Sequence, residues 1–410
     1  MPDIKTILSA TRALTLSGVP TGFQPSLLAD LARAAAHSGK GGRAVFIAAD
    51  EAAMRAIGAT AQFFAPDLDV VSFPAWDCLP YDRASPTLRV MAERNAALHR
   101  LQQKATGPQL FLTTANAATQ RTLTPFRIRQ LVATLKPGER IDRDKLAALL
   151  QANGYVRTDT VHDHGEYAVR GGIVDLFPSG EEQALRLDFF GDEIESVRTF
   201  SPDDQRTTGR VDGFTLLPAS ETLLDEDSIK RFRARYRETF GATATGDPLY
   251  QAVSEGRRLA GMEHWLPLFE DKMATLFDHL RDDDIVLRDA GTAAAAEGRM
   301  EAIADYYENR KRADAAQPGS FRPLPAKSLY LTNKEWEAGL EAATAHLVTP
   351  FHEPESKTVL DFEVDGARDF APERAAHANV YEAVVDHLEA LRKEGRKPVL
   401  ASYSNGARER

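Results

Sequence analysis

Cysteine is nearly absent from this chain of 410 residues, in which Cys78 is the only one. A single cysteine excludes disulfide bonds within the chain and zinc sites built from several cysteines, which fits a reducing compartment. The sequence also lacks an apolar run long enough to cross a membrane, and its first residues lack the charged and then apolar pattern of a signal peptide. We therefore predict a cytoplasmic protein that does not bind membranes.

Positive charge is in deficit as well. The chain has 50 Lys and Arg against 60 Asp and Glu, a formal net charge of −10. This balance argues against a dedicated DNA-binding module, which is usually basic, although it leaves room for a local basic patch. Hydrophobic residues make up 43% and charged residues 27%, the composition of an ordinary globular protein. The length predicts two to four domains.

A phosphate-binding loop is missing where the first strand and helix would place one. The segment Ser17–Ser26 has two glycines that are four residues apart instead of five. Phe23 occupies the place of the lysine that would bind the β- and γ-phosphates, and Pro25 removes a backbone donor near the start of the helix. We interpret the segment as a tight turn that enters a helix. For this chain we predict no ATP hydrolysis, no cofactor site and no catalytic residue.

Three other segments imitate functional motifs. Ser38–Gly42 contains a Gly-Lys pair but follows a helix and precedes a strand, the reverse of a phosphate loop, so we interpret it as a helix C-cap and turn. Val45–Glu51 resembles the acid-ended strand of ATPases, and we interpret it as a buried strand with Asp50 capping the next helix. His162–His164 offers three metal donors without a second cluster, which predicts hydrogen-bonding loop residues and no metal site.

Residues 11–125 alternate between short apolar strands and amphipathic helices. Such alternation is typical of a parallel sheet that is covered by helices on both faces, so residues 1–125 are expected to form the first part of an α/β lobe. The expected strands are 14–16, 44–48, 70–73 and 110–113, and the expected helices are 25–37, 51–63 and 87–103.

Turns and hairpins dominate residues 126–211, which we predict to be a small α+β domain inserted into the lobe. A strand is expected at 128–134 and a helix at 143–153, and Gly191-Asp192 is the best candidate for a tight turn. Residues 212–340 are expected to complete the lobe, with helices at 228–240 and 292–315 and a strand at 284–287.

Residues 341–410 are expected to begin a third α/β domain. Strands are predicted at 358–364 and 398–402, with a helix at 380–392 between them. Because a further helix would begin close to Arg410, we expect the chain to be a piece of a longer protein that is cut inside this domain.

The segment Gly165–Arg206 carries the strongest candidate site. Leu185, Leu187 and Phe189 alternate in sequence with three other residues, so a strand would bury these three and expose the others, which are Arg186, Asp188 and Phe190. An exposed aromatic side chain beside an arginine is typical of a binding hot spot. Two alternatives stay open. One is a set of surface ion pairs from Arg170 and Arg186 to Glu166, Asp188 or Glu195, and the other is a bulge that folds Phe190 onto the core.

Three ordered blocks of this region resemble a segment shared by the excinuclease component UvrB and the bacterial transcription-repair-coupling factors. The blocks are Arg170–Pro178, Arg186–Ser196 and Gln205–Thr207. Two more blocks, Phe73–Asp82 and Ala260–Phe269, favour the family of coupling factors over UvrB. The resemblance covers nearly the whole chain and is weakest after residue 340. It implies a degenerate helicase-like lobe with an inserted domain.

By this resemblance, Arg170, Arg186 and Phe190 match positions that bind UvrA, the excinuclease component that is the partner of UvrB. It implies an N-terminal adaptor that recruits UvrA to stalled RNA polymerase in transcription-coupled nucleotide excision repair. For the full-length parent it implies an ATP- and Mg-dependent DNA translocase that binds RNA polymerase and DNA, and a C-terminal part that masks the UvrA site. The alternative is a damage-probing, nucleotide-dependent helicase like UvrB itself.

The aromatic segment Trp76–Tyr81 bears on that alternative. We interpret it as an extended loop that Trp76, Leu79 and Tyr81 fix to the lobe. In UvrB this region has a long aromatic hairpin that separates DNA strands. Only about a dozen residues lie between Phe73 and Pro86, too few for a hairpin that passes through a duplex.

Overall fold

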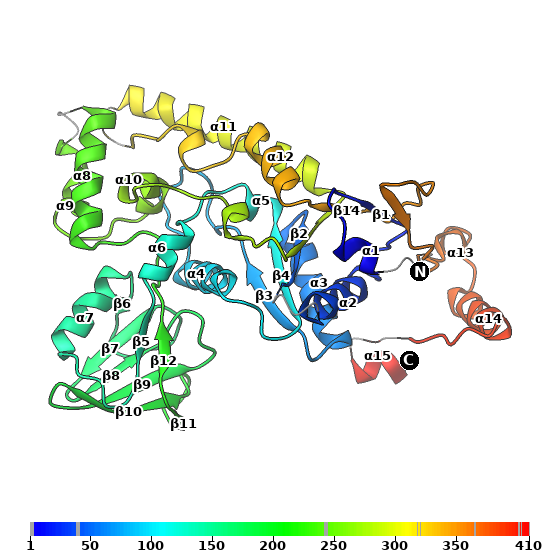
Figure 1. Ribbon diagram of the computed structural model, residues 1–410, viewed down its shortest axis with the longest axis horizontal. Helices are drawn as coiled ribbons and strands as arrows, with labels where there is room; N and C mark the ends of the chain where they lie inside the picture. The colour runs from blue at the N-terminus through cyan, green and yellow to red at the C-terminus, as the bar shows by residue number, and fades with distance from the viewer. Residues whose placement is uncertain are drawn as a thin grey trace. The chain divides into compact units, whose positions relative to one another are not determined.

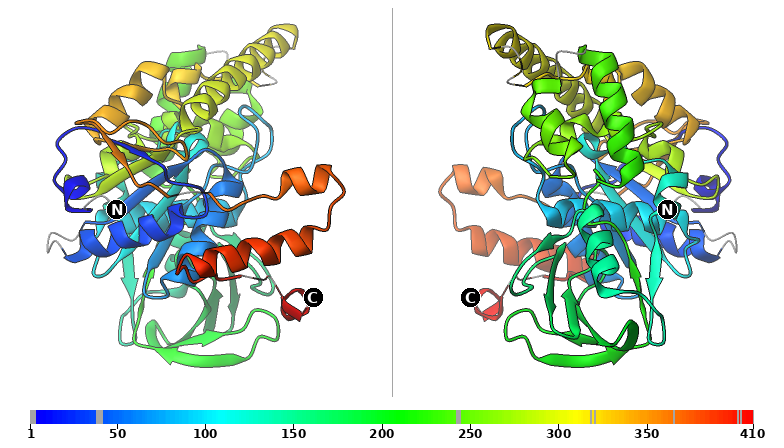
Figure 2. Two further views of the ribbon diagram at one scale, coloured as in Figure 1. Left: turned by 90° about the vertical axis from the view of Figure 1, so that its right-hand side faces the viewer. Right: turned by 90° about the vertical axis from the view of Figure 1, so that its left-hand side faces the viewer.

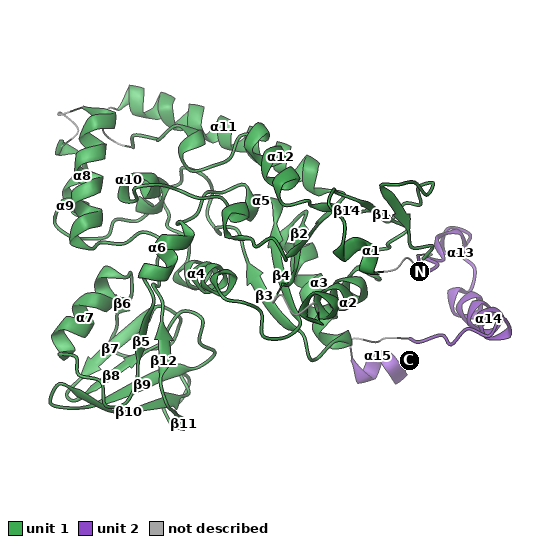
Figure 3. Ribbon diagram, in the orientation of Figure 1, with its two compact units in different colours: residues 1–364 green, residues 365–410 purple. Residues whose placement is uncertain are grey.

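The computed structural model describes residues 4–37, 42–241, 245–317, 319, 321–364, 366–400, 402 and 404–409. The chain divides into two compact units, residues 1–364 and residues 365–410, which Figure 3 shows in different colours. Residues 38–41 of the predicted C-cap and turn lie outside the described residues. Within the described part of the chain, no helix is both long and apolar enough to span a membrane.

The larger unit contains a seven-stranded sheet in the order β15-β1-β14-β13-β2-β4-β3, and every pairing in it is parallel. The predicted α/β fold class is confirmed. The neighbouring interior strands β2 and β4 are buried throughout, as expected for strands covered on both faces (Figure 1). The strands are β1 (Thr15–Ser17), β2 (Ala44–Ala48), β3 (Asp69–Phe73), β4 (Gln109–Thr114), β13 (Ile285–Asp289), β14 (His346–Val348) and β15 (Val359–Asp361).

Two hydrophobic cores lie on opposite faces of this sheet, because successive strand residues point to opposite sides. Ala44, Phe46 and Ala48 belong to one core, and Val45 and Ile47 belong to the other. The first core takes its helical residues from α1 (Ile4–Leu8), α2 (Gln24–His37) and α3 (Glu51–Phe64). The second takes them from α4 (Leu88–Gln102), α5 (Ala115–Ala118), α8 (Glu226–Phe240), α9 (Pro248–Ser254), α10 (Leu266–Phe269), α11 (Thr292–Ala316) and α12 (Asn333–Ala342).

A second, mixed sheet follows in the order β11-β10-β9-β8-β7-β6. Its strands are β6 (Val156–Arg157), β7 (Glu166–Arg170), β8 (Ile173–Leu176), β9 (Ala184–Phe190), β10 (Glu193–Phe200) and β11 (Thr207–Val211), and β5 (Ala133–Leu135) pairs separately with β12 (Phe214–Leu216). Helix α7 (Arg143–Ala152) packs along one face of this small sheet (Figures 1 and 2). Leu146 and Leu150 of α7 share a core there with Val174, Leu187 and Val197. We call the opposite face of the small sheet its outer face.

The strand predicted at 128–134 is wrong. The structure has the helix α6 (Pro125–Gln130), and β5 begins only at Ala133. Thr124 caps the helix by accepting a hydrogen bond from the Arg127 amide at 3.1 Å, and Pro125 occupies the first turn, where its fixed φ suits a helix. The apolar residues of this segment suit a strand as well as a helix, and the cap decides between them.

Two strands that follow the boundary predicted at residue 341 pair with the first strand of the chain. The backbone register joins Thr15 to Leu347 of β14 and to Val359 of β15. Both neighbours of the first strand therefore lie more than 300 residues later in the chain. A hydrogen bond from the Leu14 amide to His346 Nδ1 joins residues 332 positions apart at the same place.

The smaller unit contains α13 (Ala371–Ala375), α14 (Val380–Lys393) and α15 (Asn405–Glu409). The strand predicted at 398–402 is wrong for its described residues, because 398–400 and 402 have irregular backbone. Val399 and Leu400 are 82% and 73% exposed. A short apolar segment needs hydrogen-bonding neighbours to form a strand.

Candidate partner-binding surface

Phe190 stands at the end of a hairpin on the small sheet. It is the last residue of β9, it pairs with Glu193 across the turn Gly191-Asp192, and Gly191 adopts the positive φ of 63° that this tight turn requires. The Phe190 side chain is 82% exposed. The alternative in which Phe190 folds onto the core is therefore wrong. A largely exposed aromatic ring at a hairpin end is a candidate contact residue for a protein partner.

Asp175 lies at the centre of the outer face, beside the predicted site residues. It faces Arg186 directly in the register of β8 and β9, and its side chain is 1% exposed. Its Oδ1 accepts a hydrogen bond from Arg186 Nε at 2.7 Å, and its Oδ2 accepts one from Arg186 Nη2 at 2.9 Å. The same Oδ2 accepts a third bond from Arg170 Nη2 at 2.5 Å. One carboxylate therefore holds both predicted arginines.

Arg186 is largely enclosed, so its predicted exposure is wrong. Its side chain is 15% exposed and lies over the ring of Phe200, 4.8 Å from the ring centroid. Its Nη1 also donates to the Gln205 carbonyl at 3.4 Å. The hydrogen bonds to Asp175 raise the Arg186 pKa, so the guanidinium group stays charged.

Arg170 is more accessible, with 49% of its side chain exposed. It still pairs with Ile173 across the Gly171-Gly172 turn, so the two glycines do not change the face on which it lies. Its Nη2 donates a hydrogen bond to Asp175 Oδ2. Its remaining N–H groups are the donors of this cluster that are best placed for an external acceptor.

The structure places the three predicted site residues on one small sheet but gives the arginines a different partner from those considered. Glu166 accepts from the His162 and Asp163 amides, and Asp188 accepts from Arg198, so the predicted pairs to Glu166, Asp188 or Glu195 are wrong. The sequence reasoning missed Asp175. The available signal was an acidic residue inside the otherwise apolar strand Ile173–Leu176.

A second ion pair lies next to this cluster. Arg198 donates through Nε and Nη2 to the two Asp188 oxygens at 2.7 and 2.6 Å, and Ser196 donates to Asp188 at 2.5 Å. Partial burial opposes ionisation of Asp188, but the hydrogen bonds from Arg198 and Ser196 outweigh it and lower the carboxyl pKa. Asp188 is therefore paired mainly with Arg198, although it also attracts the nearby Arg186.

The segment that imitates a metal site is a loop. His162 and Asp163 donate their amides to Glu166 at 2.7 and 3.0 Å, and the His164 ring packs on Phe177 with 3.8 Å between centroids. Across the described residues, no group of three or more His, Cys, Asp or Glu side chains is arranged to hold a metal ion.

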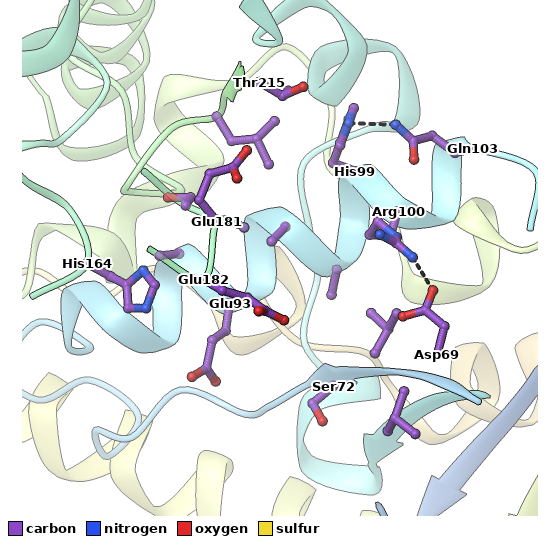
Figure 4. A pocket seen from close by; sticks show the side chains of 18 residues that line it. Asp69, Ser72, Glu93, His99, Arg100, Gln103, His164, Glu181, Glu182 and Thr215 are labelled. Carbon is purple, nitrogen blue, oxygen red and sulfur yellow. Dashed lines mark hydrogen bonds and ion pairs between the residues drawn. The ribbon is translucent and has the colours of Figure 1, made fainter. Parts of the chain in front are cut away.

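A cavity of ≈ 560 Å³ lies where the inserted domain meets the lobe, between α4 and the loops around Glu181 and Thr215 (Figure 4). Asp69 in this cavity is bound by Arg100, and burial raises the pKa of Glu181. Glu93 and Glu182 add further negative charge to its lining. The cavity is therefore acidic, which is unsuitable for a phosphate or a nucleic acid backbone.

Side chains from the end of the larger unit pack against Gly18, in the segment where a phosphate loop would lie. Gly18 has φ of 61°, and a Cβ built on it would lie 2.4 Å from Asp361 Oδ1 and 2.6 Å from His352 Nδ1. His352 and Asp361 are bonded to each other at 3.0 Å, and the Phe23 ring lies 6.2 Å from that of Phe362. A carboxylate therefore lies against Gly18, where it would repel a phosphate.

The predicted role of Asp50 is confirmed. Asp50 caps α3 by accepting a hydrogen bond from the Ala53 amide at 2.8 Å. The acid at the end of the buried strand β2 therefore satisfies a backbone donor at the start of the next helix.

The two blocks that distinguish the coupling factors in sequence contact each other in the structure. Trp76 and Tyr81 are buried and flank the His264 ring, with 5.7 and 6.2 Å between ring centroids. Ser85 donates to Glu263 at 2.6 Å. The predicted fixing of the aromatic loop is confirmed for Trp76 and Tyr81, but Leu79 is 53% exposed and that part of the prediction is wrong.

Residues 133–221 match the family model of the UvrB interaction domain. The inserted domain is therefore similar to the domain of this name, and the match covers its two sheets and α7. The resemblance seen in the sequence blocks is confirmed at a finer level too: the chain is related to the N-terminal region of the transcription-repair-coupling factors.

The similarity extends well beyond the interaction domain. The chain is 41% identical over 245 residues to the transcription-repair-coupling factor of Haemophilus influenzae, covering 59% of this chain and 21% of that protein. It is 36% identical over 293 residues to that of Escherichia coli, covering 71% and 25%, and 34% identical over 333 residues to that of Myxococcus xanthus, covering 71% and 27%. The chain spans about a quarter of the length of the curated relatives it matches.

Proposed function

We propose that this chain is an adaptor that recruits UvrA through the outer face of its inserted domain. The observation that carries the proposal is the 82% exposed ring of Phe190 on a UvrB interaction domain, beside the half-exposed Arg170. Phe190 would supply desolvated contact area, and Arg170 and Arg186 would supply charge-assisted hydrogen bonds. The acceptor on UvrA would be acidic, with an apolar pocket for the ring.

We further propose, from the resemblance, that this adaptor takes part in a larger reaction. In the full-length parent, a DNA translocase driven by ATP and Mg would displace stalled RNA polymerase, and this part would then bring UvrA to the lesion. A C-terminal part of the parent would mask the same face at rest. On this proposal the chain acts in the cytoplasm, and the isolated chain binds UvrA more tightly than the intact parent does.

Replacing Phe190 by alanine should weaken the complex with purified UvrA by about 2 kcal/mol, which is about a 30-fold rise in Kd. The reason is the loss of an exposed aromatic anchor from the centre of the contact. Isothermal titration calorimetry or biolayer interferometry with the whole chain measures the effect.

Phe63→Ala is the matched control, because Phe63 is 74% exposed but lies on α3 of the lobe. This variant should bind UvrA as the unchanged chain does. Equal Kd values for Phe190→Ala and the unchanged chain would remove the assignment of this face.

The alternative function, a nucleotide-dependent helicase like UvrB, is supported only by the parallel sheet. Because Phe23 stands in the place of the phosphate-binding lysine and Asp361 lies against Gly18, we expect no saturable heat when ATP and Mg are titrated into the chain. A saturable isotherm at millimolar ATP or below would instead favour the helicase.

A further inference from the structure

A single carboxylate on the outer face carries two cations. Asp175 sits in the middle of β8, and its side chain is 1% exposed although the face around it is open at Arg170 and Phe190. Burying a carboxylate is costly unless it is paired and hydrogen-bonded. Asp175 meets this condition through the two arginines, because the side-chain bonds that the structure describes for it come from Arg170 and Arg186.

The bonds to Asp175 fix the direction of the Arg186 guanidinium group and tether that of Arg170 at one nitrogen. Arg186 uses the fork formed by Nε and Nη2 on both oxygens of Asp175, at 2.7 and 2.9 Å, and Arg170 reaches Oδ2 at 2.5 Å. A forked arginine on a carboxylate is held in one plane, unlike a lysine, whose ammonium group is a point charge on a flexible stem. The Phe200 ring also packs against the Arg186 guanidinium group, with 4.8 Å from its central carbon to the ring centroid.

The cluster keeps an excess of positive charge. Arg170 and Arg186 bring two positive charges, and Asp175 brings one negative charge. Asp188, the next acid on this face, is bound by Arg198 and Ser196. One positive charge is therefore available on the sheet that ends in the exposed ring of Phe190, and an acidic group near an apolar pocket is the partner surface that fits it.

We propose that Asp175 is a positioning residue that holds Arg170 and Arg186 in the orientation in which they receive an acidic group of UvrA. This inference rests on the proposed function. Asp175 is too deeply buried to touch the partner, so it acts through the arginines. Its contribution is preorganisation: two long side chains that would lose rotamer freedom on binding are already ordered in the free protein.

The test is Asp175→Asn in the whole chain, with the Kd for purified UvrA as the readout. The amide keeps the size of the side chain but loses the charge and one acceptor oxygen, and we expect the affinity to fall about tenfold. The matched control is Asp247→Asn, because Asp247 is a buried acid held by Arg322 at 2.7 Å and by Tyr236 at 2.8 Å within the lobe. The control should lower the melting temperature but leave the Kd unchanged.

A double-mutant cycle separates positioning from a general loss of structure. In a chain that already carries Arg170→Ala and Arg186→Ala, Asp175→Asn should change the Kd no further, because the groups it orients are gone. Arg186→Lys, which keeps the charge but loses the fork, should weaken binding in the intact background by about tenfold. This variant carries the test if Asp175→Asn fails to fold.

Three outcomes decide the matter. Unchanged affinity for Asp175→Asn or Arg186→Lys, with weakened binding by Arg170→Ala and Phe190→Ala, would overturn the positioning role and leave the proposed function intact. An equal loss with and without the two arginines would also overturn it. Unchanged affinity for all the surface variants would overturn both proposals.

Discussion

Replacing Arg94 by alanine is expected to lower the free energy of unfolding by about 3–5 kcal/mol, because it leaves a buried carboxylate without its counter-ion. The Arg94 and Glu221 side chains form an ion pair and are 0% and 2% exposed. Arg94 lies on α4 of the lobe, and Glu221 follows the last strand of the inserted domain. Trp76 also donates to Glu221 at 3.2 Å, and Arg94 donates to the Pro74 carbonyl at 2.7 Å. The pair therefore joins three segments.

Urea denaturation of the Arg94→Ala variant measures this loss, and the same helix offers the control. Arg89 pairs with Glu93 at 3.1 Å one turn earlier, but these side chains are 68% and 42% exposed. Arg89→Ala should cost about 0.5 kcal/mol or less. Replacing both Arg94 and Glu221 by methionine should cost less than Arg94→Ala, since no charge is then left unpaired. Similar losses for Arg89→Ala and Arg94→Ala would contradict the role given to burial.

Acidification from pH 7 to pH 5 is expected to destabilise the larger unit by about 2 kcal/mol for each of three buried histidines. Burial lowers the pKa of His264, His279 and His346 from 6.5 to about 4. Between these two values the unfolded chain binds a proton that the folded chain does not. Stability from these groups is therefore present above pH 6.5, is lost as the pH falls towards 4, and changes little below that.

His264 is the best histidine for the test, because the structure describes no hydrogen bond for either of its ring nitrogens. Besides burial, Asp82 raises its pKa, and Arg310 and Arg299 lower it. His264→Phe keeps a ring between Trp76 and Tyr81 and should reduce the loss of unfolding free energy between pH 7 and pH 5 by about 2 kcal/mol.

The control for this titration is His162→Gln, at an exposed loop position, which should leave the loss of stability unchanged. A pH dependence that is the same in both variants would exclude protonation of His264 as a cause.

Local features of the fold are predictable where one physical signal dominates. The apolar run Ala44–Ala48 can only be a strand covered on both faces, and β2 has these bounds. Helix α6 is not predicted from the sequence, because its apolar residues fit the spacing of a strand as well as that of a helix. Only the Thr124 cap distinguishes the two. The order of the strands is out of reach, since β1 pairs with strands that lie more than 300 residues later and no local pattern encodes such partners.

Part of the candidate site is predictable from local sequence and part of it is not. The alternation around Phe190 favours its exposure but leaves a bulge possible, and the structure excludes the bulge's effect because the ring is 82% exposed at the strand end. The partner of Arg186 is not predictable from β9 alone. It depends on the register between β8 and β9, which puts Asp175 opposite Arg186 and brings Arg170 to the same oxygen. Register is a property of the assembled sheet and not of either strand.

The placement of β1 between β14 and β15 has a consequence for synthesis on the ribosome. Thr15 leaves the exit tunnel early, but its hydrogen-bonding neighbours Leu347 and Val359 are translated last among the strands of the sheet. At about 5–20 residues per second, the nascent chain waits roughly 20–70 seconds before this edge of the sheet can close. During that interval the inserted domain, whose pairings are nearly all between consecutive strands, is free to fold first.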